Sequence, residues 1–151
     1  MNTFEQSLNS LLVDTFNSIL KFEEISLRNI LHTPVTISEA HVIEAIGKQG
    51  SGVTVSEIAS SLDVALPTIT VAVKKLESKG LVAKVPCTVD GRRSIISLTD
   101  AGKYIDRAHS IFHRRMVRDI SRGFLDSEKD VLLGIIKKLG EFFKEKAEVP
   151  A

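Results

Sequence analysis

Apolar residues recur at three- and four-residue intervals along most of the chain, which is the spacing that places them on one face of an α-helix. The pattern is clearest at the two ends. Near the N-terminus the apolar stripe consists of Phe4, Leu8, Leu11, Leu12, Phe16, Ile19, Phe22 and Ile25. Near the C-terminus it consists of Val131, Leu132, Ile135, Ile136, Leu139, Phe142 and Phe143. The pattern predicts long amphipathic helices over residues 1–31 and 126–148.

A segment in the middle of the chain predicts two short helices joined by a tight turn. Thr54 and Glu57 have the spacing of a capping box, in which each side chain binds the backbone amide of the other residue at the start of a helix. A short break precedes Pro67, which fits the first turn of a second helix because that turn does not need its N–H group. Gly80 supplies the left-handed residue that commonly ends a helix.

The second of these helices has two different faces. Its inner face consists of Ile69, Ala72, Val73 and Leu76. Its outer face carries hydroxyl groups, a β-branched side chain and lysines, namely Pro67, Thr68, Thr70, Val71, Lys74 and Lys75. Hydroxyl and methyl groups near the start of such a helix can contact base edges, thymine methyl groups and phosphates in the DNA major groove. We therefore expect the outer face to bind DNA.

The pattern changes from helical to extended after Gly80. Residues 81–87 and 94–98 are rich in β-branched side chains, and the Asp90-Gly91 pair between them is a strong signal for a hairpin turn. Arg92 and Arg93 follow that turn, and arginine suits both the narrow minor groove and the DNA phosphates. The segment predicts a basic wing. The alternative interpretation is a charged hairpin tip that only maintains solubility.

Several short motifs follow one another in a fixed order, namely Ile58-Ala59, Leu62, Thr68-Ile-Thr70, Leu76-Glu-Ser-Lys-Gly80-Leu-Val, Asp90-Gly-Arg92 and Leu98-Thr99-Asp-Ala-Gly102. As a set they resemble the signature of MarR-type winged-helix repressors over essentially the whole chain. One departure is Ala65, where relatives often carry a helix-capping serine.

The resemblance implies a mainly α-helical fold with a two-stranded β-wing, in which residues 1–151 form a single domain. Within it, residues 36–99 would form the winged helix-turn-helix and residues 100–122 a connecting helix. The helices over residues 1–31 and 126–148 would form a dimerisation region.

The terminal helices predict a homodimer, because two stripes that contain aromatic residues would bury poorly within one small domain. A two-fold dimer presents two recognition helices about one DNA turn apart, so the double-stranded target would be a pseudo-palindromic operator. The alternative is that both stripes are buried within a monomer.

Composition and charge add few limits. The chain holds one cysteine, which excludes an internal disulfide framework, and no apolar run long enough to span a bilayer. No signal-peptide pattern is present, so we expect a cytoplasmic protein with no membrane partner. Net charge is only +1, but residues 65–93 hold six basic residues against two acidic ones, whereas residues 1–31 hold two against four. Positive charge is thus concentrated where DNA binding would need it.

Histidines and a glutamate form a second group of candidate functional residues. His109 and His113 are four residues apart, which places both imidazoles on one face of a helix. His41 follows a second capping box at residues 36–39. In the architecture of the resembled family, the helices that carry these histidines and Glu23 meet between the dimer region and the DNA-binding lobe. Three imidazoles and one carboxylate form a suitable tetrahedral set for zinc.

The resemblance does not identify which effector the protein senses. Glu23, His41, His109 and His113 match one metal site of the zinc-uptake repressor branch of the family. The chain also resembles, more strongly overall, the branch that represses fatty-acid synthesis and senses acylated acyl carrier protein, which shares the histidines. That likeness rests on Glu23-Glu24, Leu27-Arg28, Ile46-Gly47-Lys48 and residues 109–117. The four side chains could instead form an interhelix hydrogen-bonding network or be individually exposed.

These observations predict a dimeric, sequence-specific DNA-binding transcriptional regulator, a repressor that responds to a ligand or metal in an interhelix pocket. We expect no required cofactor; zinc or another divalent metal, a small molecule and acyl carrier protein are the candidate effectors. No nucleophile–base pair or phosphate-binding glycine loop indicates an enzyme. The alternative is a metal- or protein-binding module of the same fold that does not bind an operator.

Overall fold

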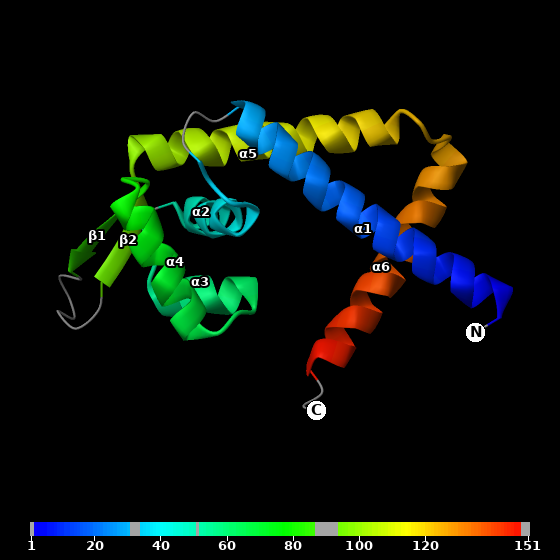
Figure 1. Ribbon diagram of the computed structural model, residues 1–151, viewed down its shortest axis with the longest axis horizontal. Helices are drawn as coiled ribbons and strands as arrows, with labels where there is room; N and C mark the ends of the chain where they lie inside the picture. Colours follow the sequence, from blue (N-terminus) through cyan, green and yellow to red (C-terminus); the bar gives the residue numbers. More distant parts are fainter. Residues whose placement is uncertain (1, 31–33, 51, 87–93, 149–151) are drawn as a thin grey trace. The chain divides into compact units, whose positions relative to one another are not determined.

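The computed structural model describes residues 2–30, 34–50, 52–86 and 94–148. Within these ranges the chain is mainly α-helical and has one two-stranded antiparallel sheet, as predicted (Figure 1). The elements in chain order are α1 (Thr3–Ile30), α2 (Ile37–Gln49), α3 (Val55–Leu62), α4 (Leu66–Ser78), β1 (Val82–Pro86), β2 (Ser94–Leu98), α5 (Asp100–Ser121) and α6 (Asp126–Glu148).

The chain divides into two compact units, Met1–Phe112 and His113–Ala151. The first unit contains α1 to α4, the sheet and the first part of α5. The second contains the rest of α5 and α6. The first unit holds the helix-turn-helix and is the one that bears on the candidate sites below.

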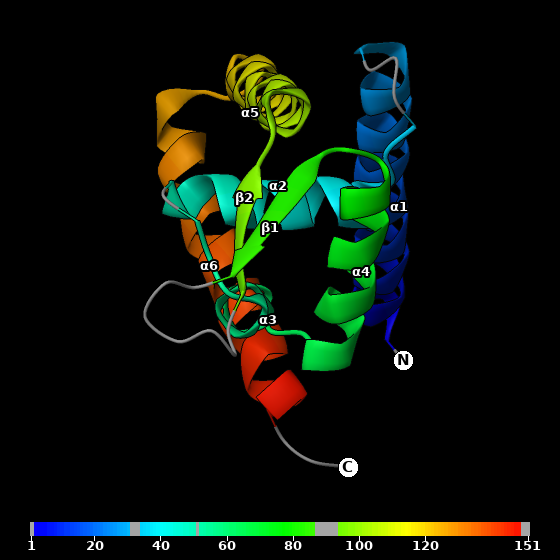
Figure 2. The same ribbon diagram turned by 90° about the vertical axis from the view of Figure 1, so that its left-hand side faces the viewer.

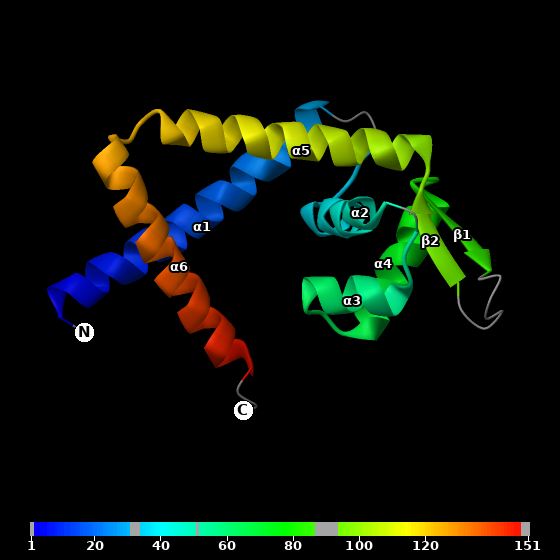
Figure 3. The same cartoon turned by 180° about the vertical axis from the view of Figure 1, so that it is seen from behind.

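The helices α2, α3 and α4 and the hairpin pack around one hydrophobic core, and Figures 2 and 3 show these elements grouped together. Each of them contributes fully buried side chains, among them Ile43 of α2, Ile58 of α3, Leu76 of α4 and Ile96 of β2. Burial of each such side chain stabilises the fold by roughly 1.5–3 kcal/mol. The core therefore holds the inner face of α4 firmly and leaves its outer face in solvent.

Capping boxes begin both α2 and α3, as the sequence predicted. The Thr36 hydroxyl accepts a hydrogen bond from the Glu39 amide at 3.2 Å, and the Glu39 carboxylate accepts one from the Thr36 amide at 2.9 Å. Thr54 and Glu57 form the same reciprocal pair at 3.3 and 2.8 Å. These pairs satisfy backbone amides that the first turn of a helix otherwise leaves without partners.

The ends of α4 also follow the prediction. Ala65 is the N-cap and offers no side-chain hydrogen bond, so the hydroxyl that relatives often place there is missing. Pro67 lies in the first turn. Gly80 follows the last turn with a φ of 70°, a left-handed conformation that favours glycine.

Thr99 connects the end of α4 to the start of α5, which it caps. Its hydroxyl donates a hydrogen bond to the Gly80 carbonyl at 2.7 Å and accepts one from the Gly102 amide at 3.1 Å. A side chain at position 102 would collide with the Leu81 carbonyl oxygen. Glycine at that position therefore permits the first turn of α5 to approach the start of the hairpin.

The hairpin strands pair in register from Val82 opposite Leu98 to Pro86 opposite Ser94. Val53, in the α2–α3 connection, adds an isolated antiparallel bridge to Ile96, with N–O distances of 2.9 and 2.8 Å. The predicted turn and the predicted wing arginines, Arg92 and Arg93, lie in residues 87–93, outside the described residues.

The three long helices begin and end within two residues of the predicted bounds. The apolar stripes of α1 and α6 remain largely exposed on the single chain, for example at Phe4, Leu11, Phe16, Val131 and Phe143.

No single helix in the described ranges is long and apolar enough to cross a membrane. The helices α3 and α4, whose axes differ by 116°, are together long and apolar enough to do so by length and composition alone. Buried core helices commonly have the same length and composition.

Candidate nucleic-acid interface and histidine cluster

The side chains predicted to contact DNA gather on the outer face of α4. Ile69, Val73 and Leu76 bury the opposite face in the core. The exposed residues of the outer face are Pro67, Thr68, Val71, Lys74 and Lys75, and Thr70 is partly buried. The structure thus presents one face of mixed methyl, hydroxyl and ammonium groups along α4.

The Thr70 hydroxyl differs from its predicted role in one respect. It donates a hydrogen bond to the Leu66 carbonyl one turn earlier, at 3.0 Å. Its proton is therefore used within the helix, and the oxygen can act toward a ligand only as an acceptor. A contact from Thr70 to a donor group or through its methyl group is compatible with this arrangement.

A hollow of about 710 Å³ lies next to α4. Val42 and His41 of α2 line one part of it, and Pro67, Thr68 and Lys75 line another. The expected effector pocket lies at or beside Glu23, His41, His109 and His113. This hollow, inside the first unit, is lined by one of these residues, His41.

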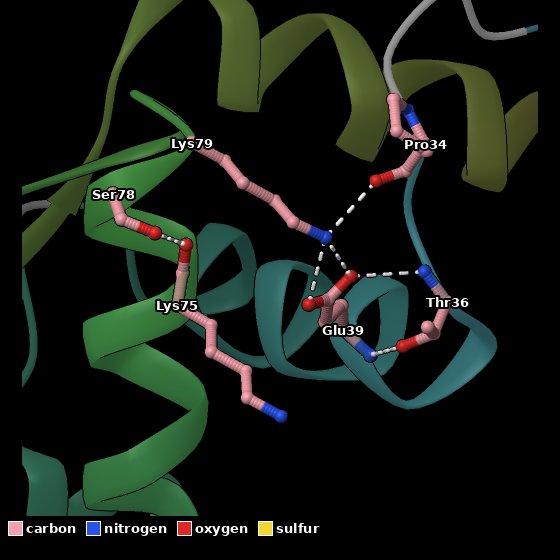
Figure 4. Close-up of polar contacts among 6 residues, drawn as sticks. All are labelled: Pro34, Thr36, Glu39, Lys75, Ser78 and Lys79. Atoms are coloured by element: carbon pink, nitrogen blue, oxygen red, sulfur yellow. Dashed lines mark hydrogen bonds and ion pairs between the residues drawn. The ribbon is translucent and has the colours of Figure 1, made fainter.

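Lys79, at the end of α4, has a polar environment that the sequence analysis did not identify (Figure 4). Its ammonium donates hydrogen bonds to both carboxylate oxygens of Glu39, at 2.9 and 2.7 Å, and to the Pro34 carbonyl at 3.0 Å. Burial by itself raises the pKa of the Glu39 carboxyl, but hydrogen bonds from Lys79 and Thr36 and the Lys79 charge lower it by more, so the pKa lies below its usual value.

The histidine cluster is built around the buried carboxylate of Glu23, which is 3% exposed. Its Oε1 atom lies 2.5 Å from His109 Nε2 and 3.4 Å from His41 Nε2. The two imidazole rings are tilted against each other with centroids 5.6 Å apart. Within the first unit, the structure therefore brings together Glu23, His41 and His109, from α1, α2 and α5.

Glu44 is a further member of the cluster that the sequence analysis missed. Its Oε2 atom lies 3.3 Å from His109 Nδ1, and its Oε1 atom lies 2.7 Å from Lys48 Nζ. Glu44 follows His41 by three residues on α2, a spacing that places both side chains on one helix face. That spacing was the available sequence signal.

His113, the fourth predicted residue, lies one helical turn beyond His109 on α5. Helical spacing puts the two imidazoles on the same face, as predicted.

The chemistry of the donors suits zinc, because imidazole nitrogen and carboxylate oxygen are common zinc ligands. Glu44 beside His109 Nδ1 also matches the carboxylate that often orients a metal-bound imidazole. However, Glu23 Oε1 and His109 Nε2 are 2.5 Å apart, and two ligands of a tetrahedral zinc are about 3.3 Å apart. The observed geometry is that of a direct hydrogen bond. A metal bound to both atoms would require them to move about 0.8 Å further apart.

Asp106 is a further carboxyl near this cluster, and its ionised form is disfavoured there. Burial, followed by the neighbouring Glu44 carboxylate, raises the pKa of the Asp106 carboxyl, although His109, Lys48 and Arg107 act in the opposite direction. A side chain at position 47 would overlap the Asp106 carboxylate, so Gly47 leaves the space in which that carboxylate lies.

Comparison with known proteins gives consistent results. The family model described as MarR family matches residues 33–93. A crystal structure of FabT from Streptococcus pneumoniae in complex with DNA is 34% identical, with a TM-score of 0.87, and the match covers 93% of this chain and 98% of that chain. The adhesin competence repressor AdcR of Streptococcus pyogenes is 25% identical, with a TM-score of 0.70, over 98% of this chain and 100% of that chain.

Among curated proteins, the HTH-type transcriptional repressor MdtR of Bacillus subtilis (strain 168) is 29% identical over 102 residues, which are 68% of this chain and 65% of that protein. The chain spans less than two thirds of the length of the curated relatives that it matches. AdcR and MdtR are named as repressors, which are regulators of transcription and not enzymes.

Proposed function

Because this chain belongs to the MarR family of transcription regulators, we propose that it is a homodimeric, sequence-specific DNA-binding repressor. In this proposal each subunit places α4 in the major groove of one half of a pseudo-palindromic operator. The wing, through Arg92 and Arg93, contacts the adjacent minor groove or phosphates. The protein acts in the cytoplasm, where it would meet its operator.

The observation that carries this proposal is the contrast between the two faces of α4. The inner face is anchored in the core, while the outer face holds a continuous set of exposed side chains ending in Lys74 and Lys75. A rigid helix with exposed methyl, hydroxyl and ammonium groups is the arrangement that DNA-binding helices use. The DNA bound by FabT, the relative with 34% identity, supports the same function.

A mobility-shift titration with the DNA upstream of the protein's own gene tests the proposal. Lys74→Ala and Arg92→Ala should each weaken binding and reduce the slope of log affinity against log salt by about one unit, because each removes one phosphate contact. Lys137→Ala on α6 removes the same charge outside the helix-turn-helix and should leave the slope unchanged. Wild-type protein that binds this DNA no better than unrelated DNA would contradict operator recognition.

We further propose that the effector acts in the first unit, at the hollow beside α4 or at the histidine cluster. A signal can change DNA binding only by its different affinity for two states of the protein. His41 supports this location because it lines the hollow and also lies 3.4 Å from Glu23 Oε1. A bound divalent metal, a small molecule and acyl carrier protein are the candidate effectors.

Metal analysis of purified protein separates the first effector from the others. If the cluster binds zinc, wild-type protein should retain about one zinc ion per chain at equimolar supply, and the His109→Ala, His113→Ala double variant should retain far less. Titratable zinc that is equal in the two proteins, or absent from both, would mean that the cluster is the hydrogen-bonding network alone. Repeating the DNA titration with zinc, EDTA and acylated carrier protein then identifies which effector changes operator affinity.

A further inference from the structure

The ammonium of Lys79 meets three acceptors that come from two distant segments of the chain. The Pro34 carbonyl belongs to the segment between α1 and α2, and the two Glu39 oxygens belong to the first turn of α2. An ammonium has three N–H donors, so these three hydrogen bonds use all of them. In Figure 4 the Lys79 side chain extends from the end of α4 toward α2 and reaches both groups.

The Glu39 carboxylate also has hydrogen-bond partners from two parts of the chain. Its carboxylate, which is 9% exposed, receives the Lys79 ammonium and also the Thr36 amide at 2.9 Å. The same side chain therefore closes the capping box of α2 and fixes the end of α4. Hydrogen bonds to charged groups are stronger than neutral ones, and the partly buried position limits screening by salt.

Lys75, one turn earlier on α4, provides a contrast. Figure 4 shows its ammonium apart from the Glu39 carboxylate, with no hydrogen bond or ion pair between the two. Lys75 is therefore available to phosphates, whereas Lys79 has its donors directed into the protein. The two lysines carry the same charge at the same helix, but only the Lys79 ammonium binds groups within the protein.

We propose that Lys79 and Glu39 are positioning residues, which set the angle of α4 against α2 and thereby the fit of α4 to the major groove without either side chain contacting DNA. This inference rests on the proposed function. Without the ion pair the end of α4 would sample several orientations, and the apparent affinity for DNA falls in proportion to the fraction of molecules in the competent one.

The salt dependence of DNA binding distinguishes positioning from a direct phosphate contact. Lys79→Met should weaken operator binding about tenfold, which corresponds to a competent fraction of about one tenth. The slope of log affinity against log salt should stay unchanged, because no phosphate contact is lost. Lys75→Met is the matched comparison and should reduce that slope by about one unit. A similar reduction in Lys79→Met would overturn the proposal in favour of a phosphate contact.

Glu39→Gln gives a test in which the two explanations predict opposite signs. Removing a negative charge from a DNA-binding lobe should strengthen binding to DNA if only net charge matters. Loss of positioning should instead weaken it about threefold to tenfold, even though glutamine can still complete a capping box. Glu77→Gln, on α4, makes the same charge change in the same lobe but outside the ion pair, and it reports the electrostatic effect alone. Stronger binding by Glu39→Gln, equal to that of Glu77→Gln, would overturn the proposal.

Two controls separate positioning from general loss of structure. Lys79→Arg keeps a cation that can bind a carboxylate with two hydrogen bonds, and it should recover most of the affinity that Lys79→Met loses. The Glu39→Gln, Lys79→Met double variant should bind DNA no worse than Lys79→Met alone, since both substitutions remove one interaction. Fully additive losses would contradict a shared role.

The same double-mutant cycle on thermal unfolding of the DNA-free protein should also show coupling between the two positions. This measurement does not depend on DNA. Wild-type protein that fails to bind DNA would overturn the proposed function and this inference with it. Wild-type binding together with unaffected Lys79 and Glu39 variants would overturn the inference alone.

Discussion

The helix-turn-helix lobe, which consists of α2 to α4 and the hairpin, buries its large apolar side chains within the single chain. The terminal helices α1 and α6 leave most of theirs exposed. In the lobe, the inward residues of α4 are buried within the single chain, and Leu76 is 0% exposed. In α1 and α6, residues of comparable size remain in solvent, with Phe16 at 63% and Leu133 at 68%. All of these helices are amphipathic in sequence, so the pattern alone does not distinguish them.

The difference indicates which part of the molecule is complete in one chain. The lobe has its own core and its own capped helices, so its geometry is set by the chain itself. The terminal helices expose large apolar patches of the kind that mark protein interfaces. We therefore propose that the lobe binds DNA and that the terminal helices form the dimer interface, and the predictions below test that division.

The largest expected effect is on assembly. Phe16→Asp places a charge on the apolar stripe of α1 and should dissociate the proposed dimer, because a buried unpaired carboxylate is costly at an interface. Loss of the second α4 helix should then weaken operator binding by roughly 10²-fold or more. Sedimentation and a DNA titration measure the two effects. Asn17→Glu, on the opposite side of α1, should leave both unchanged, and equal behaviour of the two variants would show that the stripe is not an interface.

The next effect is on the stability of the lobe. Leu76→Ala should lower the free energy of unfolding by about 2–5 kcal/mol, because it leaves a cavity in a closed core. This loss should be independent of protein concentration. Leu133→Ala on α6 is the matched truncation, and its effect on the unfolding temperature should grow as the protein is diluted if α6 contributes to a dimer. A concentration-independent loss in both variants would remove the proposed difference between the two regions.

Most of the fold was predictable because local signals and the apolar pattern agreed. The two capping boxes, the break before α4 and Gly80 each act over a few residues, and each appears in the structure as expected. The helix-turn-helix was therefore determined by chemistry close in sequence. The predicted wing turn lies outside the described residues and stays a prediction.

The candidate sites were predictable only in part, because they depend on contacts between distant segments. The sequence predicted Glu23, His41, His109 and His113 as neighbours through a family resemblance. Glu44 was missed, although its spacing from His41 was a local clue. The Lys79–Glu39 ion pair joins residues 40 positions apart, and no local pattern signals it. Lys79 was instead counted among the charges available to DNA.

The smallest expected effect concerns Asp106. Its raised pKa means that ionisation of this carboxyl is less favourable in the folded protein than in the unfolded chain. Asp106→Asn should therefore raise the free energy of unfolding by less than about 1 kcal/mol at neutral pH. The gain should appear as pH rises through the raised pKa and vanish below about pH 4, where the carboxyl is protonated in the folded and unfolded states alike. Unfolding temperatures of the two proteins measured from pH 3.5 to 8 test the sign. A variant that is less stable at neutral pH would show that Asp106 is stabilised as the anion by Lys48, Arg107 or His109.

The stoichiometry of the DNA complex tests the division between lobe and terminal helices most directly. Sedimentation of the protein with a duplex that carries its operator measures chains per duplex. If the lobe binds DNA and the terminal helices form the dimer, two chains should bind together to one pseudo-palindromic site, with no stable complex that contains one chain. A tight, sequence-specific complex of one chain per duplex, or the absence of any complex with wild-type protein, would contradict it.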